Sequence, residues 1–224
     1  MQVGEGVSKV IRLCDSIIKF KKENFQMSTP NNVDEFVFLA RVAEQAERFD
    51  DMVTYLEKVL EVKGSEVNSD ERNLISVAFK NLISSKRAAC RTISAIEQNP
   101  KYSKFNDALM TYKGEIERQL IQDCRRVIAI IDAKVLGAAG CEGESKAFFV
   151  KMKGDYFRYI SENAKDAELE EVKQAALTAY EAANGIDLPP CNPIKLGLAL
   201  NFSVFHYEVM KNHAQACTLA DNAL

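Results

Sequence analysis

Two basic side chains in the first half of the chain have the spacing of one helix face. Lys80 and Arg87 are seven residues apart, close to two helical turns, so both would project from the same side of a helix. Together they could provide a local basic site for a phosphate group. The same pair also fits an ordinary solvated face, and the spacing alone leaves both interpretations open.

A second basic segment combines a carboxylate, a guanidinium and a phenol. Asp155 precedes Arg158 by three residues and Tyr159 by four, and Lys151 lies one turn earlier. A carboxylate at this spacing can hold a guanidinium in one orientation. The planar fork of arginine matches two phosphate oxygens, and a tyrosine hydroxyl could donate to a third. A surface salt-bridge ladder would give the same pattern.

An asparagine lies inside an apolar run near the C-terminus, where an amide needs hydrogen-bond partners. Asn201, Val204 and Glu208 follow i, i+3, i+7 spacing and would share one helix face. Asn201 could bond a neighbouring helix or the backbone of an extended bound peptide. His206 fits a packed side chain better than a catalytic base, because no orienting acid for it is visible.

The sequence lacks the signatures of common enzymes and metal sites. It has no G-x-S-x-G elbow, P-loop, H-E-x-x-H motif or dinucleotide-binding glycine pattern, so we expect no enzyme. The only histidines, His206 and His213, form no ligand-spaced cluster with cysteines, so no metal or cofactor is expected. The six cysteines contain no C-x-x-C pair, which is typical of reduced thiols in a cytosolic protein. They are Cys14, Cys90, Cys124, Cys141, Cys191 and Cys217.

The charge balance and the apolar runs exclude two classes of partner. The formal net charge is −3, from 29 Lys and Arg against 32 Asp and Glu, so bulk charge does not favour nucleic acid. The longest apolar runs, 36–40 and 127–131, are far shorter than the ~20 residues of a membrane span. Charged residues interrupt the N-terminal apolar stripe, so no signal peptide is expected. We therefore expect a cytoplasmic protein without nucleic-acid or membrane partners.

Apolar residues recur at the helical period along nearly the whole chain, which predicts an all-α protein of about nine helices and no strand. Short links between such helices favour an antiparallel bundle. Residues 1–30 are expected to form an amphipathic helical extension with a linker, and residues 31–224 the main helical domain. The predicted helices span residues 3–25, 34–47, 49–62, 69–97, 104–136, 144–163, 167–184, 193–209 and 212–223.

Four stretches of this sequence resemble the 14-3-3 protein family. They are AEQAERFDDM (43–52), ERNLISVAFKN (71–81), KMKGDYFRY (151–159) and PIKLGLALNFSVF (193–205). The resemblance extends from about residue 34 to the C-terminus, and the last two stretches are very specific in that order and spacing. That family is a usually dimeric scaffold of nine antiparallel helices that binds phosphoserine and phosphothreonine segments in an amphipathic groove.

The resemblance assigns roles to residues that the spacing had singled out. It implies that Asp155 orients the cations and that Asn201 bonds the peptide main chain. The implied phosphate-binding residues are Lys80, Arg87, Arg158 and Tyr159. The implied peptide-groove residues are Lys151, Asp155, Leu200, Asn201, Val204 and Glu208.

The sequence departs from the family at both ends. Residues 1–30 precede the usual start of the family, and their apolar stripe requires a partner on the body of the protein, on a second subunit or on the groove. At the other end, the family's last helix is expected to be absent, together with its tryptophan and other groove residues. The four phosphate-binding residues are present in either case.

The resemblance also implies a dimer whose ion pairs are altered. Aligned on Tyr112, the family's partners of Arg48 and Asp51 fall on Gln119 and Glu115. Asp51 opposite Glu115 would place two negative charges together, which would cost at most about 1 kcal/mol of dimer stability if the pair is exposed. We expect a homodimer, an altered dimer or a monomer. The dimer-interface candidates are Glu35, Val42, Ala46, Arg48, Asp51, Ile93, Lys104 and Tyr112, with Glu35 and Lys104 as a surviving pair.

Two functions follow from these residues. The first is an adaptor that binds phosphoserine- and phosphothreonine-containing segments of client proteins and regulates them. The alternative is a helical scaffold that binds unphosphorylated partners through the N-terminal helix or an incomplete groove. Phosphorylation of a ligand would change affinity by orders of magnitude in the first case only.

Overall fold

The computed structural model describes residues 33–138 and 140–222, so the helix expected over residues 3–25 lies outside the described part. The chain divides into two units, residues 1–35 and 36–224, and the arrangement given below is that of the second unit. The division expected at residue 30 stays a prediction.

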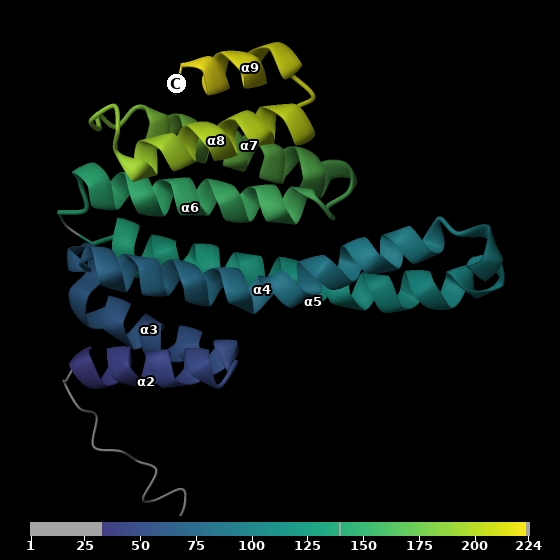
Figure 1. Ribbon diagram of the computed structural model, residues 1–224, viewed down its shortest axis with the longest axis horizontal. Helices are drawn as coiled ribbons and strands as arrows, with labels where there is room; N and C mark the ends of the chain where they lie inside the picture. Colours follow the sequence, from purple (N-terminus) through teal and green to yellow (C-terminus); the bar gives the residue numbers. More distant parts are fainter. Residues whose placement is uncertain (1–32, 139, 223–224) are drawn as a thin grey trace, which may run out of the picture. The chain divides into compact units, whose positions relative to one another are not determined.

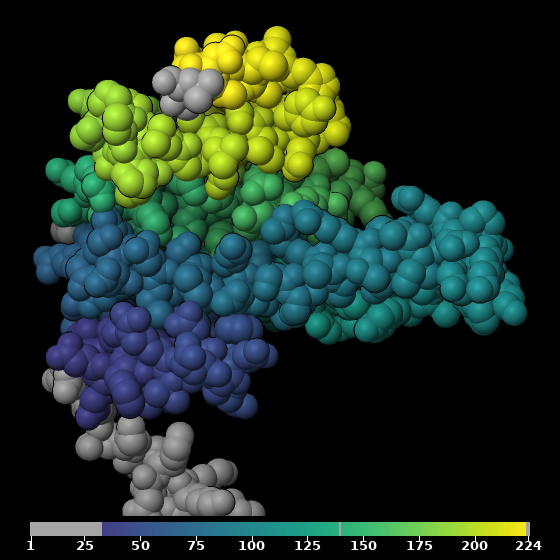
Figure 2. All heavy atoms as spheres, in the orientation of Figure 1, coloured from purple at the N-terminus to yellow at the C-terminus, as the bar shows by residue number. Residues whose placement is uncertain are grey.

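Eight α-helices make up most of the described residues, which contain no strand, and the all-α prediction is confirmed. They are α2 (Val33–Gln45), α3 (Phe49–Lys63), α4 (Ser69–Glu97), α5 (Asn106–Ile131), α6 (Gly143–Ser161), α7 (Asp166–Asn184), α8 (Pro193–Glu208) and α9 (His213–Asp221). Successive helices from α3 to α6 pack side by side, α8 rests on both α6 and α7, and α9 covers α8 (Figure 1). In the space-filling view, the side chains of α8 and α9 lie over the layer that α6 and α7 form (Figure 2).

The structure divides one predicted helix into three segments. The sequence predicted a helix over 104–136, but Pro100–Phe105 forms a 3-10 helix, α5 follows, and Asp132–Leu136 forms a π-helical turn. Apolar residues continue at nearly the same period across these junctions, and the pattern therefore did not reveal them.

Local signals fix the starts of the two helices that carry several predicted site residues. The side chain of Asn68 accepts a hydrogen bond from the backbone N–H of Glu71, whose carboxylate accepts one from the N–H of Asn68. This capping box begins α4. Asn192 begins α8 by accepting from the N–H of Ile194 at 2.8 Å, and Pro193 follows at the first helical position.

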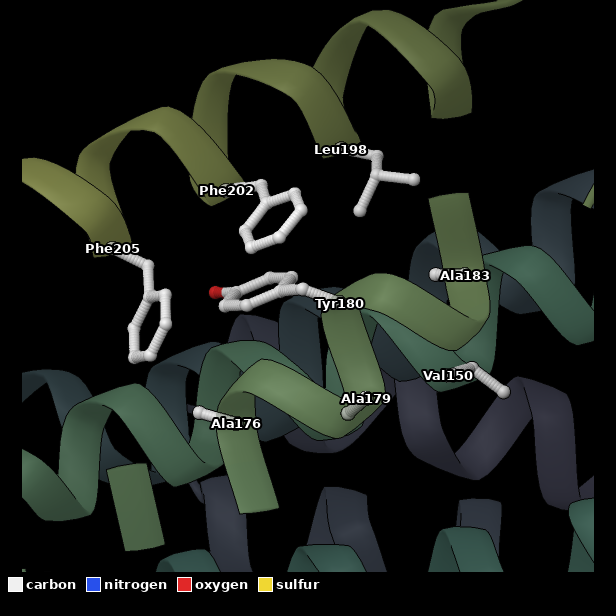
Figure 3. Close-up of a cluster of buried hydrophobic side chains, with 8 residues drawn as sticks. All are labelled: Val150, Ala176, Ala179, Tyr180, Ala183, Leu198, Phe202 and Phe205. Atoms are coloured by element: carbon white, nitrogen blue, oxygen red, sulfur yellow. The ribbon is translucent and has the colours of Figure 1, made fainter. Parts of the chain in front are cut away.

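A buried aromatic cluster joins α6, α7 and α8. Tyr180 of α7 is fully buried and stacks on Phe202 of α8, with 5.3 Å between ring centroids (Figure 3). Phe205 lies against the same ring at 5.4 Å. Gly154 of α6 permits this approach, because a Cβ atom there would lie 3.0 Å from the Tyr180 ring. The cluster consists of Val150, Ala176, Ala179, Tyr180, Ala183, Leu198, Phe202 and Phe205.

The described cysteines are all free thiols. Cys90, Cys124 and Cys141 are buried, whereas Cys191 and Cys217 are exposed. Burial raises the pKa of the Cys124 thiol to about 12. Within residues 33–138 and 140–222, no helix combines the length and apolarity needed to cross a bilayer.

Candidate functional site

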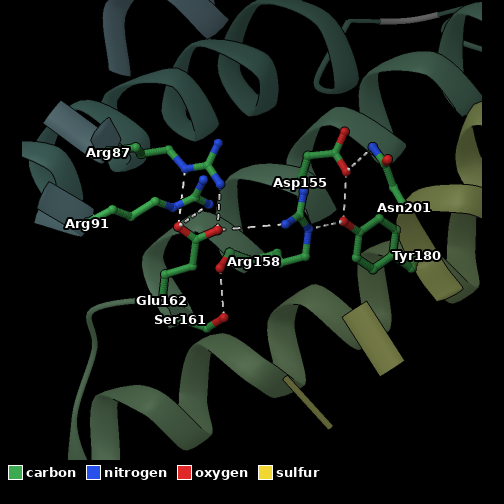
Figure 4. A network of polar contacts seen from close by, with 8 residues as sticks. All are labelled: Arg87, Arg91, Asp155, Arg158, Ser161, Glu162, Tyr180 and Asn201. Carbon is green, nitrogen blue, oxygen red and sulfur yellow. Dashed lines mark hydrogen bonds and ion pairs between the residues drawn. The ribbon is translucent and has the colours of Figure 1, made fainter. Parts of the chain in front are cut away.

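Three arginines from two helices converge on one carboxylate. Arg87 of α4 bonds Glu162 in two-point fashion, with Nη2 2.6 Å from Oε1 and Nε 3.2 Å from Oε2 (Figure 4). Arg158 of α6 approaches the same carboxylate at 3.7 Å, and Arg91 at 3.6 Å. The fold therefore brings together the two arginines that the sequence singled out. We call Arg87, Arg91, Arg158 and Glu162 the cation cluster.

The phenol ring of Tyr159 aligns the two predicted arginines. The guanidinium carbon of Arg87 lies 3.9 Å from the ring centroid, and that of Arg158 lies 4.6 Å from it. The negative face of an aromatic ring attracts such cations. Burial raises the pKa of Tyr159, so its hydroxyl stays protonated at neutral pH and can donate a hydrogen bond.

A buried polar network lies beside the cation cluster, centred on Asp155. Its Oδ1 accepts hydrogen bonds from the Tyr180 hydroxyl at 2.7 Å and from Asn201 Nδ2 at 2.8 Å, while Oδ2 accepts one from Lys151 at 2.9 Å. Arg158 Nε donates to the Tyr180 oxygen at 3.4 Å. Asp155 was expected to hold Arg158 directly, but in the described contacts it does so through Tyr180, because the carboxylate oxygens serve other donors.

Burial makes this network electrostatically strong. Only 7% of the surface of Asp155 and of Arg158 is exposed. Burial alone would lower the pKa of Arg158, but Tyr180, Tyr159 and Asp155 around it outweigh that effect and raise the pKa. The guanidinium thus stays charged in a region of low dielectric, where an arriving anion is attracted more strongly than in water.

Of the other predicted site residues, only Glu208 lines a hollow together with members of the cation cluster. Lys80 is exposed and makes no hydrogen bond or ion pair with any described residue. Leu200 is also exposed on α8. Glu208 lines a hollow of about 410 Å³ together with Arg87, Arg91 and Glu162. Val204 and Glu208 also line a neighbouring hollow of about 320 Å³ with Tyr207 and residues of α9.

The sequence did not predict three residues of the site, which are Glu162, Arg91 and Tyr180. Glu162 follows Arg158 by four residues, a helical spacing that could have indicated the pair. Tyr180 gives no such signal, because its partners lie on other helices. His206, interpreted as a packed side chain, is buried against Phe202 with 4.8 Å between ring centroids.

The predicted dimer-interface residues comprise four apolar and four charged side chains. Val42 and Tyr112 are large exposed apolar side chains, and Ala46 is exposed, whereas Ile93 is only 6% exposed within the chain itself. Among the charged candidates, Arg48 donates a hydrogen bond to Asp51 of the same chain. Lys104 lies over the ring of Phe105. Glu35 belongs to the first unit and is exposed.

Glu115, the residue expected opposite Asp51, already has partners in its own helix. It accepts hydrogen bonds from Arg118 at 2.6 Å and from Gln119 at 2.8 Å. These donors lower its pKa to about 2, so the carboxylate is charged at neutral pH.

Comparison with known proteins places this geometry in context. The family model described as 14-3-3 protein matches residues 39–224. The chain is 44% identical over 204 residues to 14-3-3-like protein A of Vicia faba, covering 88% of this chain and 77% of that protein. It is 45% identical over 202 residues to 14-3-3-like protein C of Nicotiana tabacum, covering 87% and 77%. It is 46% identical over 198 residues to 14-3-3-like protein GF14 phi of Arabidopsis thaliana, covering 85% and 73%.

Proposed function

Because the chain belongs to the 14-3-3 family of non-enzymatic adaptor proteins, we propose that it binds phosphoserine- or phosphothreonine-containing segments of client proteins and regulates those clients. The phosphate would bind at Arg87, Arg158 and Tyr159, with Lys80 contributing longer-range attraction. No chemical step is required of the protein. Binding itself would mask, hold or relocate the client.

The observation that carries this proposal is the convergence of Arg87 and Arg158 over Tyr159. Arg87 uses Nε and Nη2 on Glu162, which leaves the donors of Nη1 for a ligand. Arg158 uses Nε on Tyr180 and directs Nη1 toward Glu162, which leaves Nη2. A phosphate carries about −1.5 to −2 charges and three acceptor oxygens, so it matches these donors and the Tyr159 hydroxyl together. A serine hydroxyl offers no such charge.

The groove residues would recognise the segment around the phosphorylated residue. Asn201 donates through Nδ2 to Asp155, so its amide oxygen remains able to accept a main-chain N–H of the peptide. Leu200 and Val204 would contact apolar side chains, and Glu208 would bond the peptide. Lys151, held by Asp155, would add positive potential along the groove.

The partner set and the location follow from the same proposal. Members of this family bind client proteins and dimerise, and we propose phosphorylated clients and a homodimer or altered dimer for this chain. We propose a cytoplasmic location, with neither nucleic acid nor membrane as a partner.

A titration with a fluorescent phosphoserine peptide and its unphosphorylated form tests the proposal. The wild-type protein should bind only the phosphorylated peptide. Arg87→Ala and Arg158→Ala should each weaken binding by roughly tenfold to more than a hundredfold, because each removes charge-assisted hydrogen bonds. The matched control is Arg125→Ala, since Arg125 pairs with Glu168 at 2.8 Å outside the cation cluster.

Circular dichroism melting should show that these variants remain folded. Binding retained in both Arg87→Ala and Arg158→Ala would overturn the phosphate site. Equal affinity for the two peptide forms would favour the alternative of a scaffold for unphosphorylated partners.

A further inference from the structure

We propose that Tyr180 is a positioning residue that couples phosphate recognition by Arg158 to main-chain recognition by Asn201. This inference rests on the proposed function, because it concerns how the same site holds its binding groups. It assigns a role to a buried hydroxyl that no sequence motif identifies.

The Tyr180 hydroxyl is the link between two parts of the site. It donates its one hydrogen to Asp155 Oδ1 at 2.7 Å, so its oxygen accepts the hydrogen bond from Arg158 Nε at 3.4 Å (Figure 4). The same Oδ1 accepts from Asn201 Nδ2. The described residues show no direct hydrogen bond or ion pair between Asp155 and Arg158. The path from Arg158 to Asn201 therefore runs through the tyrosine hydroxyl and then the carboxylate.

The ring of Tyr180 holds this hydroxyl in place. It is fully buried, stacks on Phe202, lies against Phe205 and packs closely against the Gly154 backbone. Such packing leaves the ring no other position without displacing its neighbours. The hydroxyl is thus a fixed point, supplied by α7, against which groups of α6 and α8 are oriented.

Orientation matters for affinity, because a guanidinium that is already held need not be ordered when the ligand binds. With Nε bonded to Tyr180, the plane of Arg158 is set and Nη2 is free for the phosphate. With Nδ2 bonded to Asp155, the oxygen of Asn201 is free for a peptide N–H. Removing the hydroxyl leaves Nε without its partner and Asp155 Oδ1 with Asn201 as its single described donor.

Tyr180→Phe removes the hydroxyl and keeps the ring. We expect this substitution to weaken phosphopeptide binding by roughly fivefold to thirtyfold, because it removes the hydroxyl that bonds both Arg158 and Asp155. Tyr156→Phe is the matched control. Tyr156 is only 3% exposed and its hydroxyl has no hydrogen bond to the described residues. That control should bind the phosphopeptide as tightly as the wild type.

Two readouts separate positioning from a general loss of stability. In the ligand-free protein, the ¹⁵Nε–¹Hε NMR signal of Arg158 should shift and exchange faster in Tyr180→Phe, but not in Tyr156→Phe. In addition, Tyr180→Phe and Asn201→Ala should be non-additive in phosphopeptide binding, because they act on one network. Loosened packing alone would give additive losses.

Each result decides the inference. An unchanged Arg158 signal, unchanged affinity in Tyr180→Phe, or additive losses would each overturn it. If wild-type protein fails to bind the phosphopeptide, the proposed function falls and the coupling falls with it. The NMR measurement uses no ligand. If the wild type fails to bind the phosphopeptide but the Arg158 signal still shifts in Tyr180→Phe, the proposed function is wrong and the hydrogen bond between Tyr180 and Arg158 still holds.

Discussion

The Nη2 atom of Arg87 lies 2.6 Å from Oε1 of Glu162, and this ion pair ties α4 to the C-terminal end of α6. The carboxylate also lies within 4 Å of Arg91 and Arg158. It therefore offsets the mutual repulsion of three cations in the ligand-free protein. An anionic ligand entering the cation cluster would meet guanidiniums that are already oriented and already partly neutralised.

The first prediction concerns the charge of Glu162. Glu162→Gln should lower the free energy of unfolding by about 1–2 kcal/mol, between the values for exposed and for buried ion pairs, since 23% of its side chain is exposed. Added sulfate or inorganic phosphate should recover more stability in this variant than in wild type, because the anion replaces the missing charge. Urea unfolding with and without sulfate measures both effects.

The control for this experiment is Glu168→Gln, which removes a carboxylate bonded to Arg125 away from the cation cluster. Sulfate should stabilise that variant and the wild type equally. An equal sulfate response in all three proteins would show that Glu162 does not balance the cluster.

The second prediction concerns Gly154, against which the Tyr180 ring packs. An added Cβ would lie 3.0 Å from two atoms of that ring, which also stacks on Phe202. Gly154→Ala should therefore destabilise the protein by about 1–3 kcal/mol through overpacking, reduced by up to ~1 kcal/mol of gained helix propensity. It should also weaken phosphopeptide binding by displacing the Tyr180 hydroxyl.

Thermal melting and peptide titration measure these two effects. Gly114→Ala on α5 is the matched control, because a Cβ there would meet no atom within 4 Å. That substitution should leave stability unchanged or slightly higher. A Gly154→Ala protein as stable as the wild type would contradict the proposed packing constraint.

The sequence predicted helices well where periodicity and capping agreed. The start of α4 at its Asn68 cap and the start of α8 at Pro193 both follow from local residue types. The 3-10 and π segments around α5 were missed, because neither interrupts the apolar period. The 3-10 segment has local signals of its own, since Asn99 accepts a hydrogen bond from the N–H of Lys101 and Pro100 begins the segment, whereas the π-helical turn has no side-chain cap.

The candidate site was predictable only in part for a similar reason. Helical spacing grouped Lys80 with Arg87, and Asp155 with Arg158 and Tyr159, but no spacing rule relates α4 to α6. The resemblance supplied that relation, and the fold places Arg87 and Arg158 on one carboxylate. Tyr180 joins the site from α7 through tertiary contacts alone, so a local pattern had no means of finding it.

The third prediction concerns thiol reactivity. Cys191 and Cys217 are exposed, whereas Cys124 is fully buried and burial raises its pKa to about 12. Because the thiolate is the reactive form, iodoacetamide at neutral pH should label the two exposed cysteines and leave Cys124 unlabelled until the protein unfolds. Peptide mapping by mass spectrometry distinguishes the sites. Labelling of Cys124 as fast as Cys191 in folded protein would contradict the expected burial.

The fourth prediction concerns pH and His206. Burial lowers the pKa of His206, with partial opposition from Glu181, and its Nδ1 atom has no hydrogen-bond partner among the described residues. The unfolded chain therefore binds the proton more readily than the folded one. The contribution of His206 to the free energy of unfolding should be constant above the free-histidine pKa of about 6.5. It should fall as the pH drops below that value.

His206→Phe should remove that part of the pH dependence, because a phenyl ring fits among Phe202 and Phe205 without a titratable group. Urea unfolding between about pH 5.5 and 7.5 measures it, in a window above most carboxylate titration. An identical slope in wild type and variant would show that another group is responsible.

The last prediction concerns the dimer contact expected from the family resemblance. Asp51 and Glu115 would face each other across that contact with like charges, and donors from Arg118 and Gln119 keep Glu115 ionised. Glu115→Lys should convert this repulsion into attraction and shift the monomer–dimer equilibrium toward the dimer. The expected gain is at most roughly fivefold in the dissociation constant for each pair. Glu115→Gln separates the two contributions, because it removes the repulsion without adding an opposite charge and should have a smaller effect.

Sedimentation equilibrium at low and high salt measures all three proteins, and the differences should shrink as salt rises. A dissociation constant that is the same in all three at low salt would place Glu115 outside the dimer contact.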